Sequence, residues 1–352
     1  MNQAHQRESN MELLRIISMI SIVIFHFVIH AIIPSYSGPS SLMDGMMAVL
    51  HIGTVCFILI SGYFGIKFSL KGLIKLYVQC TFYSIVIYAF YISLNPDEFI
   101  LKDFVKSFFP VQLWFIQVYF CLYLISPIIN IPLQKASTQK KIFLIVLLGI
   151  ISFVFGQFVD ELKNGMNVVN FIFIYYIGNL IRYNIKCNLR SYRKHFISLY
   201  LILNLVVFLT IFLSGHYSNV NYLTLKFFYP FNGIGLIINA ILFLLIFLTI
   251  QIKSKFINWI AISALPIYLI HENKYVGKYL YGFVTQLRPE ISNIFVYPLI
   301  IVFTGLVVCV LCVLIDKLLS PIIEGITIIL LNNKYIKLLD AKIESLLQEK
   351  SE

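Results

Sequence analysis

The first apolar run, Met11 to Ile33, constrains the fold most, because it carries ionisable side chains within a segment long enough to cross a membrane. At ~1.5 Å per residue this run exceeds the ~30 Å hydrocarbon core of a bilayer. Arg15 and His26 are separated by about 16 Å along the helix axis and by about 20° beyond three full turns, so both leave one face of the helix. His30 follows one turn later on the same stripe.

Ionisable groups inside a span cost at least ~2.5 kcal/mol each for arginine, so they normally face a cavity or a partner. The simpler interpretation is that Arg15 snorkels to the membrane interface and that His26 only packs against its neighbours. Because the cost is incurred twice on one face, the pair favours a polar cavity beside this helix.

Composition extends this interpretation to the whole chain. Of 352 residues, 59% are hydrophobic and only 12% are charged, which predicts an all-α polytopic membrane protein. The net charge of +11 does not predict nucleic-acid binding, because the lysines and arginines alternate between loops and form no stripe. The first run is too long and too charged for a cleavable signal peptide. Cys309 and Cys312 fall inside an apolar run, where small packing residues are expected.

Ten apolar runs predict about ten transmembrane helices. The runs are 11–33, 43–66, 73–94, 113–131, 142–159, 167–181, 196–214, 233–250, 256–271 and 293–315. If the N-terminus is cytoplasmic, most of the 27 Lys and Arg residues lie on the cytoplasmic side, and so does the C-terminus. We therefore expect a transmembrane domain over 1–320 and a cytoplasmic, interfacial amphipathic tail over 321–352. The outer connections 95–112 and 272–290 are too short for a separate domain.

Near the cytoplasmic side, several residues are candidates for binding. Glu12 lies one turn before Arg15 and can pair with it. Ser61, followed by Gly62 and Tyr63, either marks a close helix contact or lines a substrate passage. Lys71 and Lys75 share a helix face, either as a solvated pair or as a clamp for an anionic donor.

At the outer ends of the fourth and ninth runs lie the other candidates. Trp114 with Phe115 is typical of an interfacial aromatic belt, although aromatic faces also stack on sugar rings. The ninth run ends at His271 and Glu272, at a depth similar to that of His26. Pro266 should break the helix ladder there, and such a break is tolerated only inside protein or beside a cavity.

At these residues the chain resembles the membrane-bound acyltransferase-3 family, and within it the bacterial capsule and exopolysaccharide O-acetyltransferases. The motifs that carry the resemblance are Glu12-Leu-Leu-Arg15, the arginine-to-histidine spacing, the run ending Ser61-Gly62-Tyr63-Phe64, Trp114-Phe115 ahead of Ser126-Pro127, and Tyr268-Leu-Ile-His271-Glu272. Two departures are visible. Many members have an arginine-rich motif where this chain has Lys71 and Lys75, and paired histidines where it has His26-Phe27.

The resemblance implies an enzyme of the bacterial cytoplasmic membrane that transfers an acetyl group from acetyl-CoA to a hydroxyl of a cell-surface or lipid-linked glycan, without a metal. It implies that Arg15, Lys71 and Lys75 bind the donor and that Glu12, Ser61, Tyr63, Trp114 and Tyr268 contact substrate. His26 would act as general base or briefly carry the acetyl group, and His271 and Glu272 would assist at the acceptor.

Two other functions fit a bundle with internal charges. A transporter or flippase for a lipid-linked saccharide would line a pathway with them, although the inverted repeats common in transporters are not evident in the sequence. A membrane-bound O-acyltransferase that uses long acyl chains is the other, but its usual histidine and asparagine pairing is also not evident. Neither the identity of the glycan nor the oligomeric state follows from the sequence.

Overall fold

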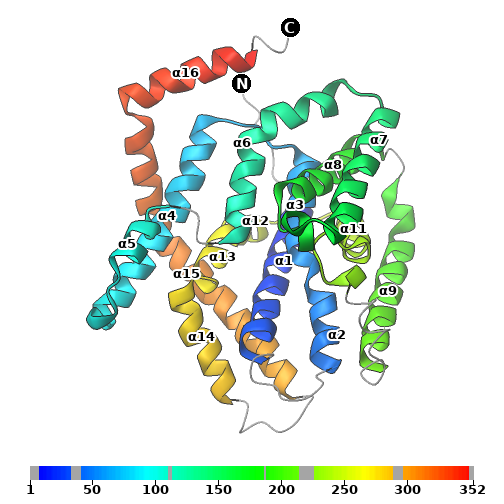
Figure 1. Ribbon diagram of the computed structural model, residues 1–352, viewed down its shortest axis with the longest axis horizontal. Helices are drawn as coiled ribbons and strands as arrows, with labels where there is room; N and C mark the ends of the chain where they lie inside the picture. Colours follow the sequence, from blue (N-terminus) through cyan, green and yellow to red (C-terminus); the bar gives the residue numbers. More distant parts are fainter. Residues whose placement is uncertain are drawn as a thin grey trace.

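A computed structural model describes residues 8–32, 41–109, 113–185, 188–213, 226–287 and 296–348, and these residues form helices joined by turns, without a strand among them (Figure 1). The helices are α1 (Ser9–Phe27), α2 (Ser41–Leu50), α3 (Ile52–Phe64), α4 (Leu70–Leu94), α5 (Leu101–Ser107), α6 (Trp114–Lys135), α7 (Thr138–Gly149), α8 (Val168–Asn184), α9 (Arg193–Leu213), α11 (Ile234–Leu248), α12 (Lys255–Ala261), α13 (Ala264–His271), α14 (Lys274–Leu287), α15 (Val296–Leu331) and α16 (Lys334–Gln348). Shorter π and 3-10 turns cover Val28–Ile32, Pro96–Glu98, Ile150–Val154, Phe155–Gln157, Asp160–Gly165 and Leu189–Tyr192.

The predicted all-α polytopic class is confirmed. Where the structure describes them, the ten expected runs each coincide with one helix or with two or three consecutive helical segments. Among the described residues, seven helices are long and apolar enough to cross a membrane, and Ile234–Leu248 and Lys255–His271 are shorter apolar helices. A bilayer requires two things of such helices. Their backbone polar groups must be satisfied within the helix, and their side chains must be mostly apolar.

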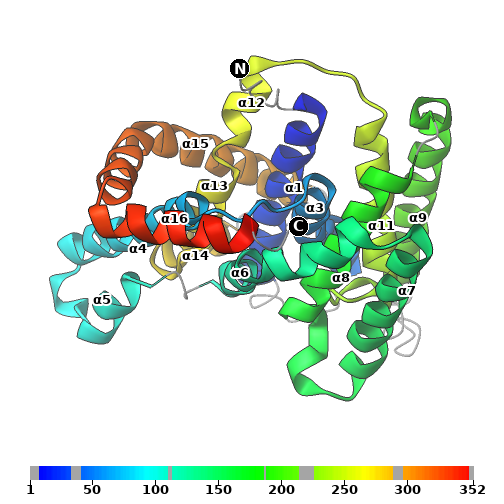
Figure 2. The ribbon, with the colours of Figure 1, turned by 90° about the horizontal axis from the view of Figure 1, so that it is seen from above.

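Helix α1 lies at the centre of the bundle. It contacts α2, α3, α11, α12, α13 and α15, and the view from above shows helices on both sides of it (Figure 2). Two buried apolar clusters meet along its length, one around Met11 and Leu14 and the other from Met19 to Ala31. Polar residues of α1 therefore face the interior of the protein.

Two glycines let α3 and α8 pack with their backbones in contact. A Cβ atom at Gly62 would lie 2.0 Å from the carbonyl oxygen of Tyr175, and one at Gly178 would lie 2.3 Å from that of Leu59. No side chain fits in so little space, so these positions hold the helix pair together as small residues do in membrane bundles. The contact at Gly62 fixes the direction in which the neighbouring Ser61 faces.

The ninth run is broken, but not at the expected residue. A turn at Ile262 and Ser263 separates α12 from α13, whereas Pro266 lies inside the first turn of α13. Amide groups in a first helical turn have no intrahelical partner, so proline costs little at this position. The break therefore precedes the proline, and α13 begins a new direction that ends at His271.

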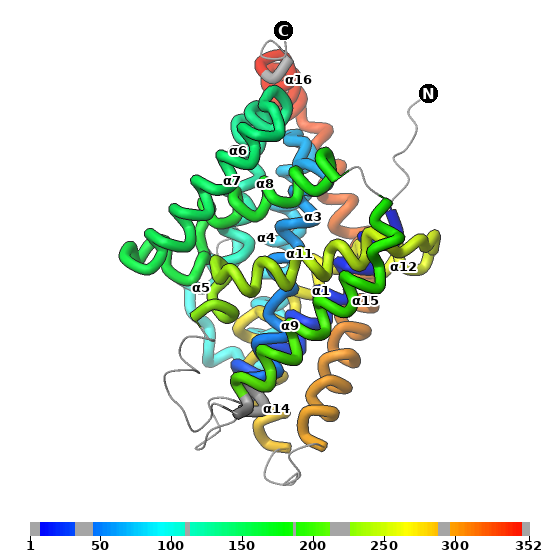
Figure 3. Tube along the Cα trace, turned by 90° about the vertical axis from the view of Figure 1, so that its right-hand side faces the viewer, coloured from blue at the N-terminus to red at the C-terminus, as the bar shows by residue number. Residues whose placement is uncertain are grey.

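The two outer connections contain helices that were not predicted. Helix α5 lies within 95–112, and α14 occupies most of 272–290. Helix α15 extends through Pro321 to Leu331, so the expected domain boundary falls inside a continuous helix, and α16 follows as a separate helix at one end of the molecule (Figure 3). The location of α16 on the inner leaflet stays a prediction.

Candidate functional site

A cavity of about 730 Å³ lies beside α1 and is lined by residues from α1, α3, α4, α6 and α13. Seven of the residues singled out from the sequence line it: Arg15, His26, Ser61, Lys75, Trp114, Tyr268 and Glu272. Because Arg15 and His26 both line it, they face the same space, and the cavity runs along α1 between them. Its size is within the range typical of pockets for small molecules and cofactors.

Four other candidates are not among the residues that line this cavity. Lys71 is exposed on α4, one turn before Lys75. Tyr63 turns to the other side of α3, where its hydroxyl accepts a hydrogen bond of 2.7 Å from Arg182. Glu12 lies behind Arg15, and His271 lies behind His26. Tyr63 thus contacts an arginine rather than this space, because residues two positions apart on a helix, such as Ser61 and Tyr63, point about 200° apart.

Arg15 is held by a carboxylate at one end of the cavity. Its Nη1 donates a 2.6 Å hydrogen bond to Oε2 of Glu12, and the Glu12 side chain is almost fully buried. The two residues are three positions apart on α1, so the pair forms across one helical turn. Glu12 therefore positions the guanidinium, which remains about a quarter exposed and available to an anion.

Further along the same helix, His26 contacts two residues from the end of α13. Its Nδ1 lies 2.9 Å from Nε2 of His271 and 2.8 Å from Oε2 of Glu272. His26 is 9% exposed and His271 only 1% exposed. The break before α13 places the last two residues of the ninth run against α1, so residues 245 positions apart in sequence share one site.

These contacts determine which nitrogen of His26 carries a proton. Nδ1 of His271 lies 2.6 Å from the carbonyl oxygen of Ile267, which can only accept, so this nitrogen is the donor. Nε2 of a neutral His271 is then an acceptor, and so is Glu272. Nδ1 of His26 must therefore donate, which leaves a lone pair on its Nε2, for which we find no partner among the described residues. A histidine oriented in this way by a carboxylate is suited to general-base or nucleophilic catalysis.

Two further side chains hold Glu272, and the sequence analysis did not assign them roles. The hydroxyl of Tyr281 donates 2.9 Å to Oε2, and Nε2 of His30 lies 3.3 Å from Oε1. His30 belongs to a π turn, Val28–Ile32, a local feature that is frequent at functional sites. The sequence places His30 on the same helix face as Arg15 and His26. Tyr281 lies in α14, a helix that no pattern in the sequence predicted.

One part of the cavity lining is aromatic, and apart from Trp114 its residues were not predicted. It includes Phe25, His51, Tyr229 and Phe231 beside Trp114. The ring of His51 stacks on Phe25 with 4.4 Å between centroids, and Phe231 meets His51 edge-on at the same distance. These residues come from three separate segments, so only the tertiary structure brings them together.

His26, His271 and Glu272 could also offer one ligand atom each to a metal ion. Zinc ligands at 2.0–2.1 Å in a tetrahedron lie about 3.3 Å from one another. The separations of 2.8 and 2.9 Å from Nδ1 of His26 are instead normal for direct hydrogen bonds. The present geometry therefore fits a hydrogen-bonded group better than an arranged metal site.

Comparison with known proteins identifies the family of this chain. The family described as Acyltransferase domain, acyltransferase-3, matches residues 8–316. No curated protein and no solved structure shows a significant match. The matched region includes α1, with Arg15 and His26, and the end of α13, with His271 and Glu272. The chain therefore belongs to the acyltransferase-3 family and is an integral membrane acyltransferase.

Proposed function

We propose that this protein transfers an acetyl group from cytoplasmic acetyl-CoA to a hydroxyl of a cell-surface or lipid-linked saccharide, in the cytoplasmic membrane of a bacterium. The observation that carries the proposal is a single cavity with cations near one end and an oriented histidine further along. A donor with a charged head and a long neutral arm matches this arrangement.

Arg15 and Lys75 are the proposed ligands of the donor phosphates. Both line the cavity, and Glu12 holds the Arg15 guanidinium in place. The axial distance of about 16 Å from Arg15 to His26 is roughly the reach of an extended pantetheine arm. The thioester of a donor bound in this way comes next to His26. Lys71, which does not line the cavity, would contribute through its charge only.

His26 is the proposed base. Its Nε2 takes the proton of the saccharide hydroxyl while the hydroxyl oxygen attacks the thioester carbonyl carbon. The new bond is C–O, the bond that breaks is C–S, and the proton passes from Nε2 to the departing sulfur. The charge that develops on the imidazole is balanced by Glu272 at 2.8 Å from Nδ1. His271 is a positioning residue in this scheme, because it contacts His26 and not the cavity.

On the acceptor side, Trp114 and Tyr268 offer ring faces, and Ser61 offers a hydroxyl nearer to the Arg15 end of the cavity. Aromatic faces pack well on the C–H faces of sugars, which supports a saccharide acceptor over a protein one.

The test combines purified protein in lipid with ¹⁴C-labelled acetyl-CoA and with surface saccharide extracted from cells that lack the gene. We expect label in the saccharide with the wild type, and none with His26→Ala of equal thermal stability. A His195→Ala variant is a matched control, because His195 is exposed on α9. Translocation of the saccharide without any label transfer would instead favour a flippase.

A further inference from the structure

A second, smaller cavity of about 300 Å³ meets the first one at Glu272, which lines both. It is lined by Cys80, Ser84, Asp103, Lys106, Phe109, Leu113, Ile116, Leu269, Glu272, Asn273 and Lys274. Most of these residues belong to α4, α5, α6 and the end of α13, Lys274 begins α14, and none of the residues assigned to the donor is among them.

The small cavity lies beside the large one along the same helices. On α4, Lys75 and Gln79 line the large cavity, and Cys80 and Ser84 line the small one. On α13 and just after it, the order is the same, from Tyr268 in the large cavity to residues 269 and 273 in the small one. The small cavity therefore adjoins the large one across these helices, and the two share Glu272.

The lining of the small cavity is suited to a sugar ring. One part is apolar, with Phe109, Leu113 and Ile116, and the rim carries polar groups that can exchange hydrogen bonds with hydroxyls, including Asn273. Two carboxylates and two lysines are present, so the formal charges cancel and a polyphosphate gains little there. Ligand pockets begin at about this volume, so one ring fits and an extended chain does not.

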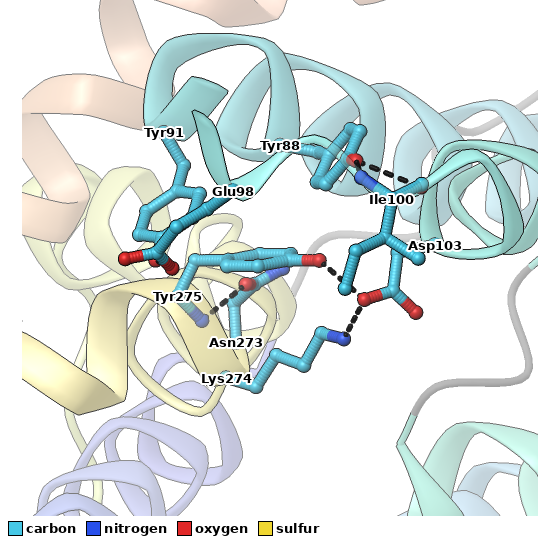
Figure 4. Close-up of polar contacts among 8 residues, drawn as sticks. All are labelled: Tyr88, Tyr91, Glu98, Ile100, Asp103, Asn273, Lys274 and Tyr275. Atoms are coloured by element: carbon cyan, nitrogen blue, oxygen red, sulfur yellow. Dashed lines mark hydrogen bonds and ion pairs between the residues drawn. The ribbon is translucent and has the colours of Figure 1, made fainter. Parts of the chain in front are cut away.

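Polar contacts hold the rim in place (Figure 4). Oδ2 of Asp103 accepts hydrogen bonds from Nζ of Lys274 at 2.6 Å and from the hydroxyl of Tyr275 at 3.0 Å. The lysine hydrogen bond lowers the pKa of Asp103 below its ordinary value. Tyr88 accepts from the backbone N–H of Ile100 at 3.0 Å, so the start of α5 is also fixed against α4. Helix α5 is therefore held in place by these contacts as one wall of the small cavity.

We propose that the small cavity is an acceptor subsite, which seats the sugar ring next to the ring that is acylated. The inference rests on the proposed acyl transfer. The reacting hydroxyl must approach Nε2 of His26 in the large cavity. Of His26, His271 and Glu272, only Glu272 lines the small cavity. A saccharide of two or more rings that lies across Glu272 occupies both spaces, and a single sugar occupies one.

The test fills the small cavity and leaves the donor end intact. Ser84→Phe places a ring into the space, and Ser93→Phe is its matched control, because Ser93 is exposed on the same helix. A second variant, Phe109→Ala, removes a partly exposed ring without adding bulk. Its control is Lys102→Ala, since Lys102 is exposed on α5 and does not line the cavity. All four are compared with wild type in thermal stability and in acetyl-CoA affinity.

The probes are surface saccharide from cells that lack the gene, used either intact or hydrolysed to single sugars. We expect Ser84→Phe to lower kcat/KM for the intact saccharide at least about tenfold, with transfer to single sugars and acetyl-CoA affinity unchanged. Phe109→Ala should raise KM for the intact saccharide several-fold. An unchanged preference for intact saccharide in Ser84→Phe overturns the subsite and leaves the proposed function standing. If the wild type transfers no acetyl group to either probe, the proposed function itself fails.

Discussion

Replacing Glu272 by glutamine tests the role of the carboxylate that holds His26. Oε2 lies 2.8 Å from Nδ1 of His26, so the centre of the charge that forms on the imidazole is about 4 Å from that of the carboxylate. At an effective dielectric constant near 20 their attraction is about 4 kcal/mol. Glutamine keeps the shape and one acceptor oxygen, so we expect a loss of about 2–4 kcal/mol, or about 30- to 1,000-fold in kcat.

The assay is release of CoA by purified protein with saturating acetyl-CoA and extracted saccharide. Glu324→Gln is the matched control, because Glu324 is an exposed carboxylate on α15. Acetyl-CoA affinity should not change, since Arg15 is about 16 Å from His26 along α1. A kcat within about threefold of wild type in Glu272→Gln would refute the orienting role, because the lost attraction would then be under 1 kcal/mol.

Three further outcomes are expected. Lys75→Ala should weaken acetyl-CoA binding several-fold by calorimetry, and more than Lys71→Ala, because only the first side chain lines the cavity. Gly62→Ala should lower the melting temperature and destabilise the protein by roughly 2 kcal/mol or more, whereas Gly325→Ala, with open space around it, should not. The pKa of Asp103 is lowered, so its contribution to stability is complete above its ordinary value of 3.8 and is lost as the pH falls through the lowered one. The protection of α5 amides from hydrogen exchange, corrected for the intrinsic exchange rate at each pH, should therefore fall only below about pH 4, and a fall already at pH 6 would contradict this assignment.

Much of the bundle could be predicted from the sequence, because a span must satisfy its backbone internally and hydropathy records that requirement directly. The site could be predicted in part for the same reason. Arg15 and His26 share a helix face by spacing alone, and equal depth suggested that His271 and Glu272 lie near His26. The structure brings Arg15, His26 and Glu272 to the lining of one cavity, and His271 contacts His26 from outside that lining.

The rest depended on tertiary contacts that no local pattern records. The contact from Tyr281 to Glu272 requires α14 to fold back over the site, and residues 272–290 looked like a loop because both charges alternate there. The aromatic wall at His51 joins three segments. The position of the break in the ninth run could not be predicted from Pro266 alone. A proline is tolerated in the first turn of a helix, so its effect depends on where α13 begins.

The end of α13 has an electrical consequence. A helix carries partial negative charge at its C-terminus, where the last carbonyl groups have no intrahelical donors. Helix α13 ends at His271, so this negative pole lies within a few ångströms of the His26 ring. An imidazolium that forms there during turnover is favoured by about 0.3–1 kcal/mol, in addition to its carboxylate partner. The short helix α13 thus acts as a fixed partial counter-charge beside His26.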